Sequence, residues 1–569
     1  MKSHNLLLSK GYFPKELPPT FTTDSFGRKI DRIVRDWSNA GLFQERDASH
    51  LEKPPGKEKR RKPFTYRLRA TESEVFSIPK GRYERRNIHI VHPLPQALLS
   101  MEIGKNWNLI EEWLSRQTFS EDKIQIGPSF ERSVKEINFS LHATKKRYLE
   151  ATSDWIVTTD VNLFYPSIYT HSIAWAAYGK ECVKSHSTKC KGSLADRIDK
   201  LVRSCNGNQT IGIPIGPETS RIVAEILSTR IEKDYYNHSD RTSVKNTTRL
   251  QDDWTIGVES LENAEHVLST ISRVYRTYGL DINGNKTSID HIIAERPRAW
   301  ISEIQTFLSY KSEKFLKKLP STWLEEFLDL VLTLQLKNSS DRVVSYALSS
   351  LKKENIAPKN IPVMESFLIK SATIAPLSLD RICQAMLDLQ SYTNALSNER
   401  ISERFIRLAE VAIEKEHLFE VMWLLYTLRG LRQCINSKAI CDASARVQSA
   451  TIALILMDMN SKNLISSELP IDEWQSQISE DSILSDWTWL MAYEGIRHGW
   501  LSDEHNLMEK PLFKPLDRQK IMFYNPNKKF SASANARKKR VKKREVFEVK
   551  DFLEDIREIE IIDFDFPEY

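Results

Sequence analysis

Residues 154–180 read DWIVTTDVNLFYPSIYTHSIAWAAYGK, and this stretch decides the fold. Its first part, Trp155–Thr159, is rich in β-formers and predicts a short buried strand. The strand leads into Asp160, where a carboxylate can face a cleft, and Pro166 then prevents further strand pairing. A helix packed behind the strand is expected over residues 169–180. One acid on one strand does not define a site, so a second acidic turn is required.

Such a turn occurs in residues 249–259, RLQDDWTIGVE. The pattern predicts a strand, a tight turn that carries Asp252 and Asp253, and a second strand. If these strands and Trp155–Thr159 are neighbours in one sheet, their carboxylates can close on the same pair of hard cations. The sequence therefore predicts a metal site built from two acidic turns that are distant along the chain.

The bulk composition sets limits on the class of protein. A length of 569 residues suggests about three to four domains, and 40% hydrophobic with 28% charged residues is a globular balance. The net charge of +6 is permissive for a nucleic-acid partner, but a merely soluble surface explains it equally well. No run approaches the roughly 20 apolar residues that span a bilayer, and the N-terminus lacks a secretory signal. We therefore expect a cytoplasmic protein with no membrane partner.

Six cysteines without a CxxC pair do not form a disulfide framework. Cys182, His186 and Cys190 follow a C-x3-H-x3-C spacing, which invites comparison with a zinc site. The spacing is atypical for structural zinc and no fourth ligand is in sight. Reduced thiols are the expected state.

A second hairpin is predicted within residues 76–96, with its turn at residues 80–82. The alternation over residues 86–90 places lysine and arginine on one face of this hairpin. Such a face can fold over a triphosphate, because arginine binds phosphate through two parallel hydrogen bonds. A basic edge strand that resists aggregation is the alternative.

Glycine and proline punctuate two further stretches. Residues 212–217 predict an irregular loop, and Thr219 or Ser220 is the expected N-cap of the helix that follows. A glycine loop before a helix lets the backbone approach a nucleotide or template closely. Further on, residues 279–287 predict a turn that presents Lys286.

Beyond about residue 300 the sequence changes to long amphipathic helices with little glycine. Helical hairpins in succession suggest an α-solenoid with a structural or partner-binding role. One of its helices is expected over residues 443–459. The chain ends in a basic stretch, residues 528–550, and an acidic and apolar stretch from Asp551. The basic stretch is either a solvated tail or a segment that grips nucleic acid.

Taken together, these pieces resemble the reverse transcriptases, in their prokaryotic defence-associated, abortive-infection branch. The likeness runs from Gly11 to about residue 295. Its marks are a first finger motif and palm motifs A to D, which read IPK…RR…I, DVNLFYPSIYTHSIAWAAYGK, QTIGIPIGPETS, LQDDW and GLDINGNKT. The resemblance implies an α/β (α+β) fold with the fingers and palm of a right-hand polymerase, followed by an all-α domain of HEAT-like helical repeats.

The resemblance also implies a division into domains. These are an N-terminal extension over residues 1–60, fingers over 61–150, the palm with motifs A to D over 151–295, a thumb-like helical connection over 296–360, helical repeats over 361–510, and a basic then acidic tail over 511–569. The stretches EVMWLLYTLRGLR and WLMAYEGIRHGWL resemble the repeat domain of that branch. A homo-oligomer built through the helical domain is a further expectation.

By this resemblance the predicted metal site gains an identity. Asp160 and Asp252 are implied as bridging ligands of two Mg²⁺ ions, with Mn²⁺ as the substitute and the Val161 carbonyl as a further ligand. Asp253 is implied as a third, supporting carboxylate. One ion would activate the primer 3′-hydroxyl and the other would hold the triphosphate.

Five more residues are implied to act on the nucleotide. Tyr165 matches the aromatic position beneath the sugar that rejects a 2′-hydroxyl, with a core tyrosine as the alternative. Lys80 and Arg86 would clamp the triphosphate, and Gly216 would let the backbone approach the incoming nucleotide. Lys286 matches the lysine that protonates pyrophosphate, with a surface lysine as the alternative.

The implied function is RNA-directed DNA synthesis from dNTPs in antiphage defence. Its nucleic-acid partners would be an RNA template or an associated non-coding RNA, and a DNA product. The chain departs from the common pattern at Leu250, Gln251 and Ile215, where primer end, nascent pair or template would pack. We therefore expect phosphoryl transfer with relaxed, repetitive or untemplated synthesis. Some members of this branch prime on a protein hydroxyl, and Tyr569 is one candidate.

Two alternatives stay open at this point. The palm could be catalytically silent and serve as a nucleic-acid or effector-binding scaffold, although clustered acids repel one another without cations. In the other alternative, the helical half is the functional part, which binds a protein partner or assembles oligomers.

Overall fold

The computed structural model describes residues 1–48, 62–81, 83–116, 119–120, 123–185, 190–239, 246–292, 299–309, 320–351 and 356–528. Within it, residues Met1–Asn527 form one compact unit. His186, Tyr569 and the tail from residue 529 lie outside the described residues, so the zinc-like spacing and the tail are untested. Among the described helices, none is long and apolar enough to cross a membrane.

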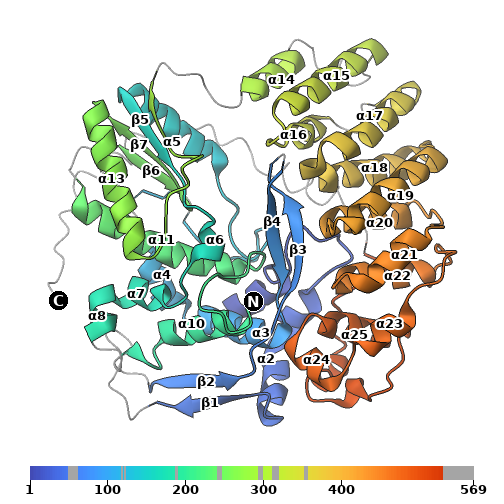
Figure 1. Cartoon of the computed structure of the whole chain (residues 1–569), viewed down its shortest axis with the longest axis horizontal. Helices are drawn as coiled ribbons and strands as arrows, with labels where there is room; N and C mark the ends of the chain where they lie inside the picture. Colours follow the sequence, from blue (N-terminus) through green and yellow to red (C-terminus); the bar gives the residue numbers. More distant parts are fainter. Residues whose placement is uncertain are drawn as a thin grey trace. The chain divides into compact units, whose positions relative to one another are not determined.

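The strand predicted at Trp155–Thr159 is confirmed with these bounds as β5, inside a four-stranded antiparallel sheet. The order of strands across the sheet is β6 (Thr247–Leu250), β7 (Asp253–Val258), β5 and β8 (Ser288–His291). Strand β5 pairs with β7 in a register that places Thr159 opposite Trp254. The predicted hairpin is thus confirmed as the direct neighbour of β5 (Figure 1). Its turn consists of Gln251 and Asp252, whereas Asp253, which was also expected at the turn, is the first residue of β7 and pairs with Leu250.

Helices cover both faces of this sheet. On one face, the ring of Trp254 lies 5.3 Å from that of Tyr235 in α11 (Glu218–His238). The opposite face carries Gly257, where a Cβ would come within 2.0 Å of the Ser153 hydroxyl, so glycine is needed for the chain after α5 (Phe139–Ala151) to pack there. Helix α13 (Leu261–Thr277) also packs against β5 and β7. The sheet is therefore a buried platform with its acidic turns at one end.

The start of α11 differs from the prediction. The helix begins at Glu218, directly after Pro217, so neither Thr219 nor Ser220 is its N-cap. The Thr219 hydroxyl lies inside the first turn and accepts a hydrogen bond from the Gln96 amide at 3.1 Å. The local pattern predicted that the Thr219 hydroxyl caps the helix, but the hydroxyl is instead used in a buried contact with Gln96, which is distant in the sequence.

A separate two-stranded antiparallel hairpin precedes the four-stranded sheet in the chain. Its strands are β3 (Glu74–Pro79) and β4 (Arg85–Ile90), which confirms the second predicted hairpin, and Ile78 lies opposite Arg86. Arg82, at the predicted turn, lies outside the described residues. The remaining elements of this half are α1 (Ser3–Lys10), α2 (Asp24–Asn39), β1 (Phe43–Asp47), β2 (Phe64–Leu68), α3 (Pro93–Lys105), α4 (Trp107–Leu114), α6 (Phe164–Ser167), α7 (Ser172–Tyr178), α8 (Lys180–Ser185) and α10 (Leu194–Ser204).

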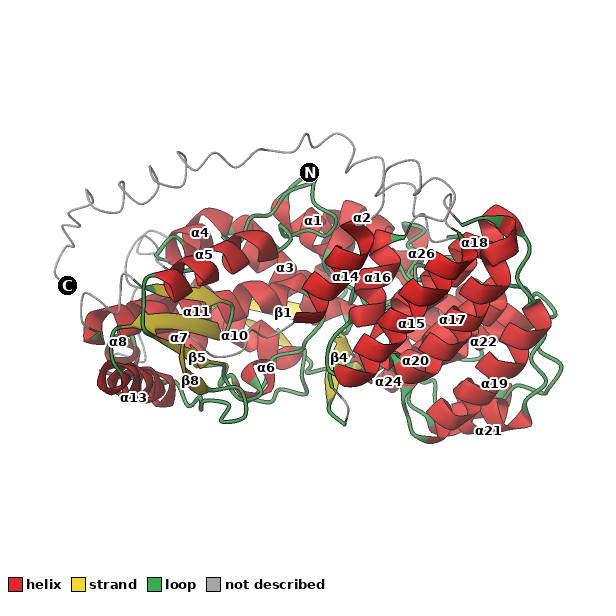
Figure 2. Ribbon diagram, turned by 90° about the horizontal axis from the view of Figure 1, so that it is seen from above, coloured by secondary structure: helices red, strands yellow, loops and turns green. Residues whose placement is uncertain are grey.

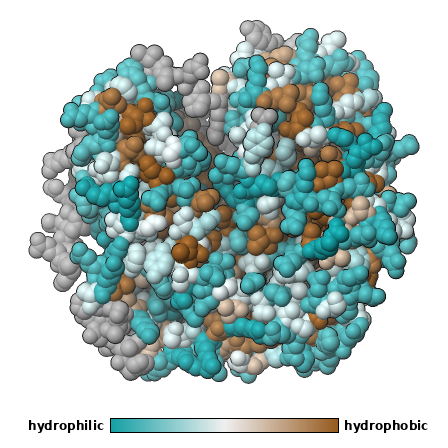
Figure 3. Space-filling model, viewed as in Figure 1, coloured by the Kyte–Doolittle hydropathy of each residue, from teal (hydrophilic) through white to brown (hydrophobic). Residues whose placement is uncertain are grey.

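The described part of the chain after residue 299 is helical, as predicted (Figure 2). Its helices are α14 (Ala299–Ser309), α15 (Ser321–Lys337), α16 (Val343–Ser350), α17 (Ile361–Ile374), α18 (Leu379–Thr393), α19 (Asn398–Glu414), α20 (Leu418–Gly430), α21 (Lys438–Arg446), α22 (Ala450–Asn460), α23 (Ile471–Ser476), α24 (Glu480–Ser485), α25 (Thr488–Arg497) and α26 (Lys514–Arg518), with short 3-10 turns η4 (Pro358–Asn360), η5 (Pro376–Ser378) and η6 (Leu507–Glu509). On the face drawn in Figure 3, apolar residues form small groups separated by hydrophilic surface.

The single helix predicted over residues 443–459 is wrong, because the chain is broken there into α21 and α22. Val447 is extended, with φ −83° and ψ 134°, and the Ser449 hydroxyl accepts a hydrogen bond from the Ile452 amide. Serine at this position caps a new helix, and a β-branched valine tolerates the extended conformation. The break could not be predicted, because the apolar periodicity of the sequence continues through it.

Candidate functional site

The two predicted acidic turns meet at one end of the four-stranded sheet. Asp160 follows β5 and Asp252 precedes β7, and the antiparallel register brings their side chains within hydrogen-bond distance of each other. Asp160 is buried and Asp252 is half-buried. Burial, then the hydrogen bond and charge of Asp160, then the charge of Asp253 raise the pKa of Asp252 well above its usual range. Two carboxylates this close disfavour double ionisation, which a cation would relieve.

The turn that carries Lys286 is joined to the chain after β5. The Asn283 amide donates to the Asp160 carbonyl at 2.7 Å, and the Asn162 amide donates to the Asp281 carbonyl at 2.9 Å. These two bonds flank the bridge between Val161 and Ile282, so the Val161 carbonyl stays outside this pairing. The predicted turn is therefore confirmed, and it packs directly on the segment with the first acid.

Lys286 itself reaches the acid pair, because its ammonium group donates to the Asp160 carboxylate. Partial burial lowers the pKa of Lys286, but the hydrogen bond and charge of Asp160 outweigh this and raise it. Half of the side chain stays accessible, at 47% exposure. The ammonium group thus supplies one positive charge beside two carboxylates.

Tyr165 lies in α6, next to the loop that precedes α11. The Ile213 amide donates to the Tyr165 carbonyl at 3.0 Å, and the Gly212 amide donates to the Ile168 carbonyl at 2.9 Å. Burial and the charge of Asp252 raise the pKa of Tyr165, so its phenol is neutral at physiological pH. The ring packs partly on the core, and the charge of Asp252 affects the pKa of the hydroxyl. Both predicted roles, a core tyrosine and a residue beneath the sugar, fit these observations.

Gly216 has a structural reason to be glycine. Its φ is +141°, and a Cβ would lie 2.8 Å from the His89 carbonyl of β4 and 2.9 Å from Pro14 Cγ. The neighbouring Ile215 carbonyl accepts a hydrogen bond from the His89 amide at 2.7 Å. The close approach at Gly216 is therefore one between the loop and the hairpin of the same chain.

Arg86 lies opposite Ile78 on the β3–β4 hairpin, and Lys80 follows the end of β3, where its amide donates to the Glu84 carbonyl at 2.9 Å. The Lys80 ammonium group lies 3.5 Å from the Glu84 carboxylate, and Arg86 is exposed. Among the contacts of the described residues, no hydrogen bond or ion pair joins either cation to Asp160 or Asp252. The structure brings together the acids, Lys286 and Tyr165, and leaves these two cations separate.

Two charged clusters were not predicted, one next to the acidic turn and one on the hairpin. Arg249 lies fully buried in β6 and pairs with Glu225 and Glu232 of α11, each at 2.7 Å. The two glutamates are seven residues apart and thus share one face of the helix, which is the only sign of them in the sequence. On the hairpin, Arg85 binds both carboxylate oxygens of Glu420 in α20, at 2.8 and 2.7 Å.

The donors at this site suit a divalent metal ion. Carboxylate oxygens of Asp160 and Asp252, together with a main-chain carbonyl, are the hard ligands that magnesium prefers. In the part of the chain that the structure describes, no group of three or more His, Cys, Asp or Glu side chains is placed to hold a metal. Asp160 and Asp252 are therefore the carboxylates that an ion at this end of the sheet would contact, and a supporting role of the exposed Asp253 stays a prediction.

Comparisons with known proteins give no family assignment. No protein-family model matches the chain, and no curated protein matches it. Among solved structures, a telomerase from Candida albicans in complex with a telomeric RNA fragment is 12% identical, with 76% of this chain and 69% of that chain covered, at a TM-score of 0.28. An apo telomerase from Candida tropicalis is 11% identical, with 79% and 76% covered, at 0.28. At such TM-scores the likeness does not bear on function.

Proposed function

We propose that this protein is a DNA polymerase of the reverse-transcriptase type. One observation carries the proposal: Asp160 and Asp252, from the ends of two adjacent antiparallel strands, lie within hydrogen-bond distance, with the Lys286 ammonium group on Asp160. The motifs that supply these residues occur in the order typical of reverse transcriptases.

In this proposal Asp160, Asp252 and the Val161 carbonyl hold the metal ions, with Asp253 in support. Bound there, two Mg²⁺ ions would activate the primer 3′-hydroxyl and neutralise the charge that develops on the pyrophosphate. The 3′-oxygen forms a bond to the α-phosphorus, and the bond from that phosphorus to the pyrophosphate oxygen breaks. Mn²⁺ would serve as a substitute ion.

The other side chains act on the nucleotide. Lys286 gives a proton to the departing pyrophosphate, a role that its contact with Asp160 supports. Tyr165, whose phenol is neutral, closes the space that a 2′-hydroxyl would need. Lys80 and Arg86 bind the triphosphate when the nucleotide bridges the hairpin and the palm. Gly216 keeps the loop before α11 against the hairpin.

The finer parts of the proposal rest on sequence. Leu250, Gln251 and Ile215 depart from the usual residues at template-facing positions, so the enzyme would make DNA with relaxed, repetitive or untemplated synthesis. The setting would be antiphage defence in the cytoplasm, with dNTPs and an RNA or DNA strand as partners.

The test is to incubate the purified protein with each dNTP and Mg²⁺, with and without added RNA, and to sequence the product. The proposal predicts DNA synthesis that Asp252→Asn abolishes and Asp290→Asn, an exposed residue of β8 in the same sheet, does not. Absence of product under every condition would contradict the polymerase. Faithful copying of any supplied RNA would contradict relaxed templating, and a biological effect that survives Asp252→Asn would favour the scaffold alternative.

A further inference from the structure

Arg249 is buried immediately before the acidic turn, with its side chain 0% exposed. Its Nε and Nη2 atoms donate to Glu232 Oε2 at 2.9 and 2.7 Å, and Nη2 also donates to Glu225 Oε1 at 2.7 Å. The remaining nitrogen, Nη1, donates to the Gln251 carbonyl at 2.6 Å. The guanidinium thus joins α11 to the main chain of the turn.

The same cluster also fixes the strand that carries Arg249. The Arg249 amide donates to the Phe119 carbonyl at 3.1 Å, and the Phe119 amide donates to Glu232 Oε1 at 2.5 Å. Arg249, Glu232 and Phe119 therefore close a ring of hydrogen bonds through both main chain and side chains. The guanidinium is held from three sides, so its one bond to the turn has a fixed direction.

The main chain at that bond is in an unfavourable conformation. Gln251 has φ +57°, in the left-handed region that side chains other than glycine seldom adopt. Such a residue persists only where its surroundings hold it. The bond from Arg249 to the Gln251 carbonyl is a direct restraint of this kind, and the next residue along the chain is Asp252.

Stability alone does not account for the cluster. Buried ion pairs add little net stability compared with apolar residues of similar size, so the Arg249 cluster is not explained by its contribution to stability. A lysine in place of Arg249 could not make these four hydrogen bonds, because its donors radiate from one nitrogen. The fork of the guanidinium is what allows contact with Glu225, Glu232 and the turn together.

We propose that Arg249 is a positioning residue for the candidate site. Its guanidinium, fixed by Glu225 and Glu232, holds the Gln251 carbonyl and so keeps the left-handed turn that aims Asp252 at Asp160. Its effect on catalysis rests on the proposed function, whereas its effect on the turn does not.

The experiment compares Arg249→Lys with Arg197→Lys in the full chain. Arg197 is a matched control, because it is 5% exposed, bonds to Glu102 at 3.1 Å and to the Gly192 carbonyl at 2.8 Å, and lies in α10 outside the acidic turns. Hydrogen exchange should quicken at the amides of residues 252–254 on the order of tenfold in Arg249→Lys only. In the same variant kcat should fall on the order of tenfold to a hundredfold, with the KM for dNTP little changed.

Two further variants keep the test decisive if Arg249→Lys does not fold. Glu225→Gln removes one buried negative charge and loosens the guanidinium, so it should move exchange at the turn in the same direction, by less. In a Gln251→Gly background, Arg249→Lys should cause a smaller rise in amide exchange at the turn and a smaller fall in kcat. The reason is that glycine adopts a positive φ without a restraint.

Three results would overturn the inference. They are unchanged amide exchange at the turn in Arg249→Lys, an equal change in exchange in Arg197→Lys, and an equal fall in kcat when Arg249→Lys is made in the Gln251→Gly background. If the wild-type protein makes no DNA, the proposed function fails, and exchange at the turn still decides the role of Arg249.

Discussion

The surroundings of Lys286 lead to the most specific prediction about the reaction. Its ammonium group donates to the Asp160 carboxylate, and it is still 47% exposed, so it can both hold a proton and release it toward a ligand. A buried or remote lysine would lack one of these two properties.

We expect Lys286→Met to lower kcat on the order of a hundredfold, with a change in the KM for dNTP of no more than about threefold. The reason is that the variant loses the proton donor but keeps the metal ligands. Rapid-quench kinetics would measure this, with Lys370→Met, an exposed residue of α17, as the control. Normal turnover in Lys286→Met would show that Lys286 is a surface lysine.

The sequence predicted these residues unequally. Asp160 and Asp252 could be found because acids that directly follow or precede short β-rich runs must lie at strand ends. Arg249 could not, because an arginine at the start of RLQDDW usually indicates an exposed side chain. Its burial depends on two glutamates in another element, and no local pattern reports that contact. Gly216 was predicted to be a position of close approach, but not one that the hairpin of the same chain would fill.

At the scale of elements, the β3–β4 hairpin is supported along its length by the helical region. Arg85 of β4 binds Glu420 of α20, and Glu74 of β3 accepts hydrogen bonds from Ser449 and Thr451 at the start of α22, at 2.8 and 2.7 Å. At the tip, a Cβ on Gly81 would lie 3.4 Å from the Ser340 hydroxyl. The helical region therefore holds the hairpin that carries Lys80 and Arg86.

Glu420→Gln should weaken nucleotide binding without affecting the chemical step. The Arg85–Glu420 pair is mostly buried, at 23% and 11% exposure, and its loss would let the hairpin move relative to the four-stranded sheet. We expect the KM for dNTP to rise about threefold to tenfold at unchanged single-turnover rate. Glu365→Gln, which removes a similar pair with Arg400 from α17 and α19, is the control. An equal KM in both variants would contradict a role of the Arg85–Glu420 ion pair in holding the hairpin.

The joint at Glu74 predicts a dependence of stability on pH. Burial raises the pKa of Glu74 from 4.5 to about 7, although the hydrogen bonds from Thr451 and Ser449 act in the opposite direction. Between these two pKa values the folded protein keeps a proton that the unfolded chain has released. The free energy of unfolding therefore falls as pH rises from about 4.5 to about 7, by roughly 3 kcal/mol, and then stays level.

Glu74→Gln tests this dependence. The variant should be more stable than the wild type at pH 8, and the difference should shrink as the pH approaches 5, as measured by urea unfolding at each pH. The same slope in both proteins would mean that Glu74 does not titrate in this range.

Short elements were predicted better than their junctions. The bounds of β5 follow from a run of β-formers that ends at an aspartate, whereas the break between α21 and α22 lies inside an uninterrupted apolar pattern. The contacts that join the hairpin to α20 and α22 link residues more than 300 positions apart. Hydrophobic periodicity carries no information about contacts between residues so far apart. The sequence therefore predicted a helical region, but not that this region supports the β3–β4 hairpin.

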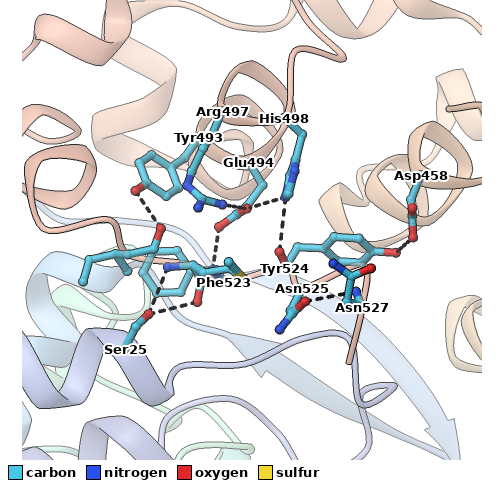
Figure 4. Close-up of polar contacts among 12 residues, drawn as sticks. Ser25, Asp458, Tyr493, Glu494, Arg497, His498, Phe523, Tyr524, Asn525 and Asn527 are labelled. Atoms are coloured by element: carbon cyan, nitrogen blue, oxygen red, sulfur yellow. Dashed lines mark hydrogen bonds and ion pairs between the residues drawn. The ribbon is translucent and has the colours of Figure 1, made fainter. Parts of the chain in front are cut away.

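At the scale of the compact unit, residues 521–527, termed the C-terminal strap, join the first helices of the chain to the last ones. On the N-terminal side, the Thr22 amide donates to the Phe523 carbonyl at 2.8 Å, and the Asn525 amide donates to the Thr20 carbonyl at 2.7 Å. Facing the strap on the other side are Tyr493, Glu494 and His498 around α25, and Asp458 of α22 (Figure 4). The strap is therefore an integral part of the unit.

Two shortened chains test the strap, one that ends at residue 528 and one that ends at residue 520, because the first keeps every described contact of the strap. A chain that ends at residue 520 loses Ile521, Phe523 and Tyr524, all fully buried, and should be less stable by more than about 4 kcal/mol. Thermal unfolding of the two truncated chains measures the difference. Equal melting temperatures would contradict the role of the strap.

At the scale of the whole molecule, the proposed polymerase needs a divalent ion shared by Asp160 and Asp252. The most direct measurement is a crystal structure of the protein with Mn²⁺ and a dNTP, with the ion located by anomalous scattering. We predict a peak bonded to carboxylate oxygens of both aspartates, which Asp252→Asn removes. A structure in which Mn²⁺ is absent from this pair, or is bonded to only one of the two aspartates, would contradict the account.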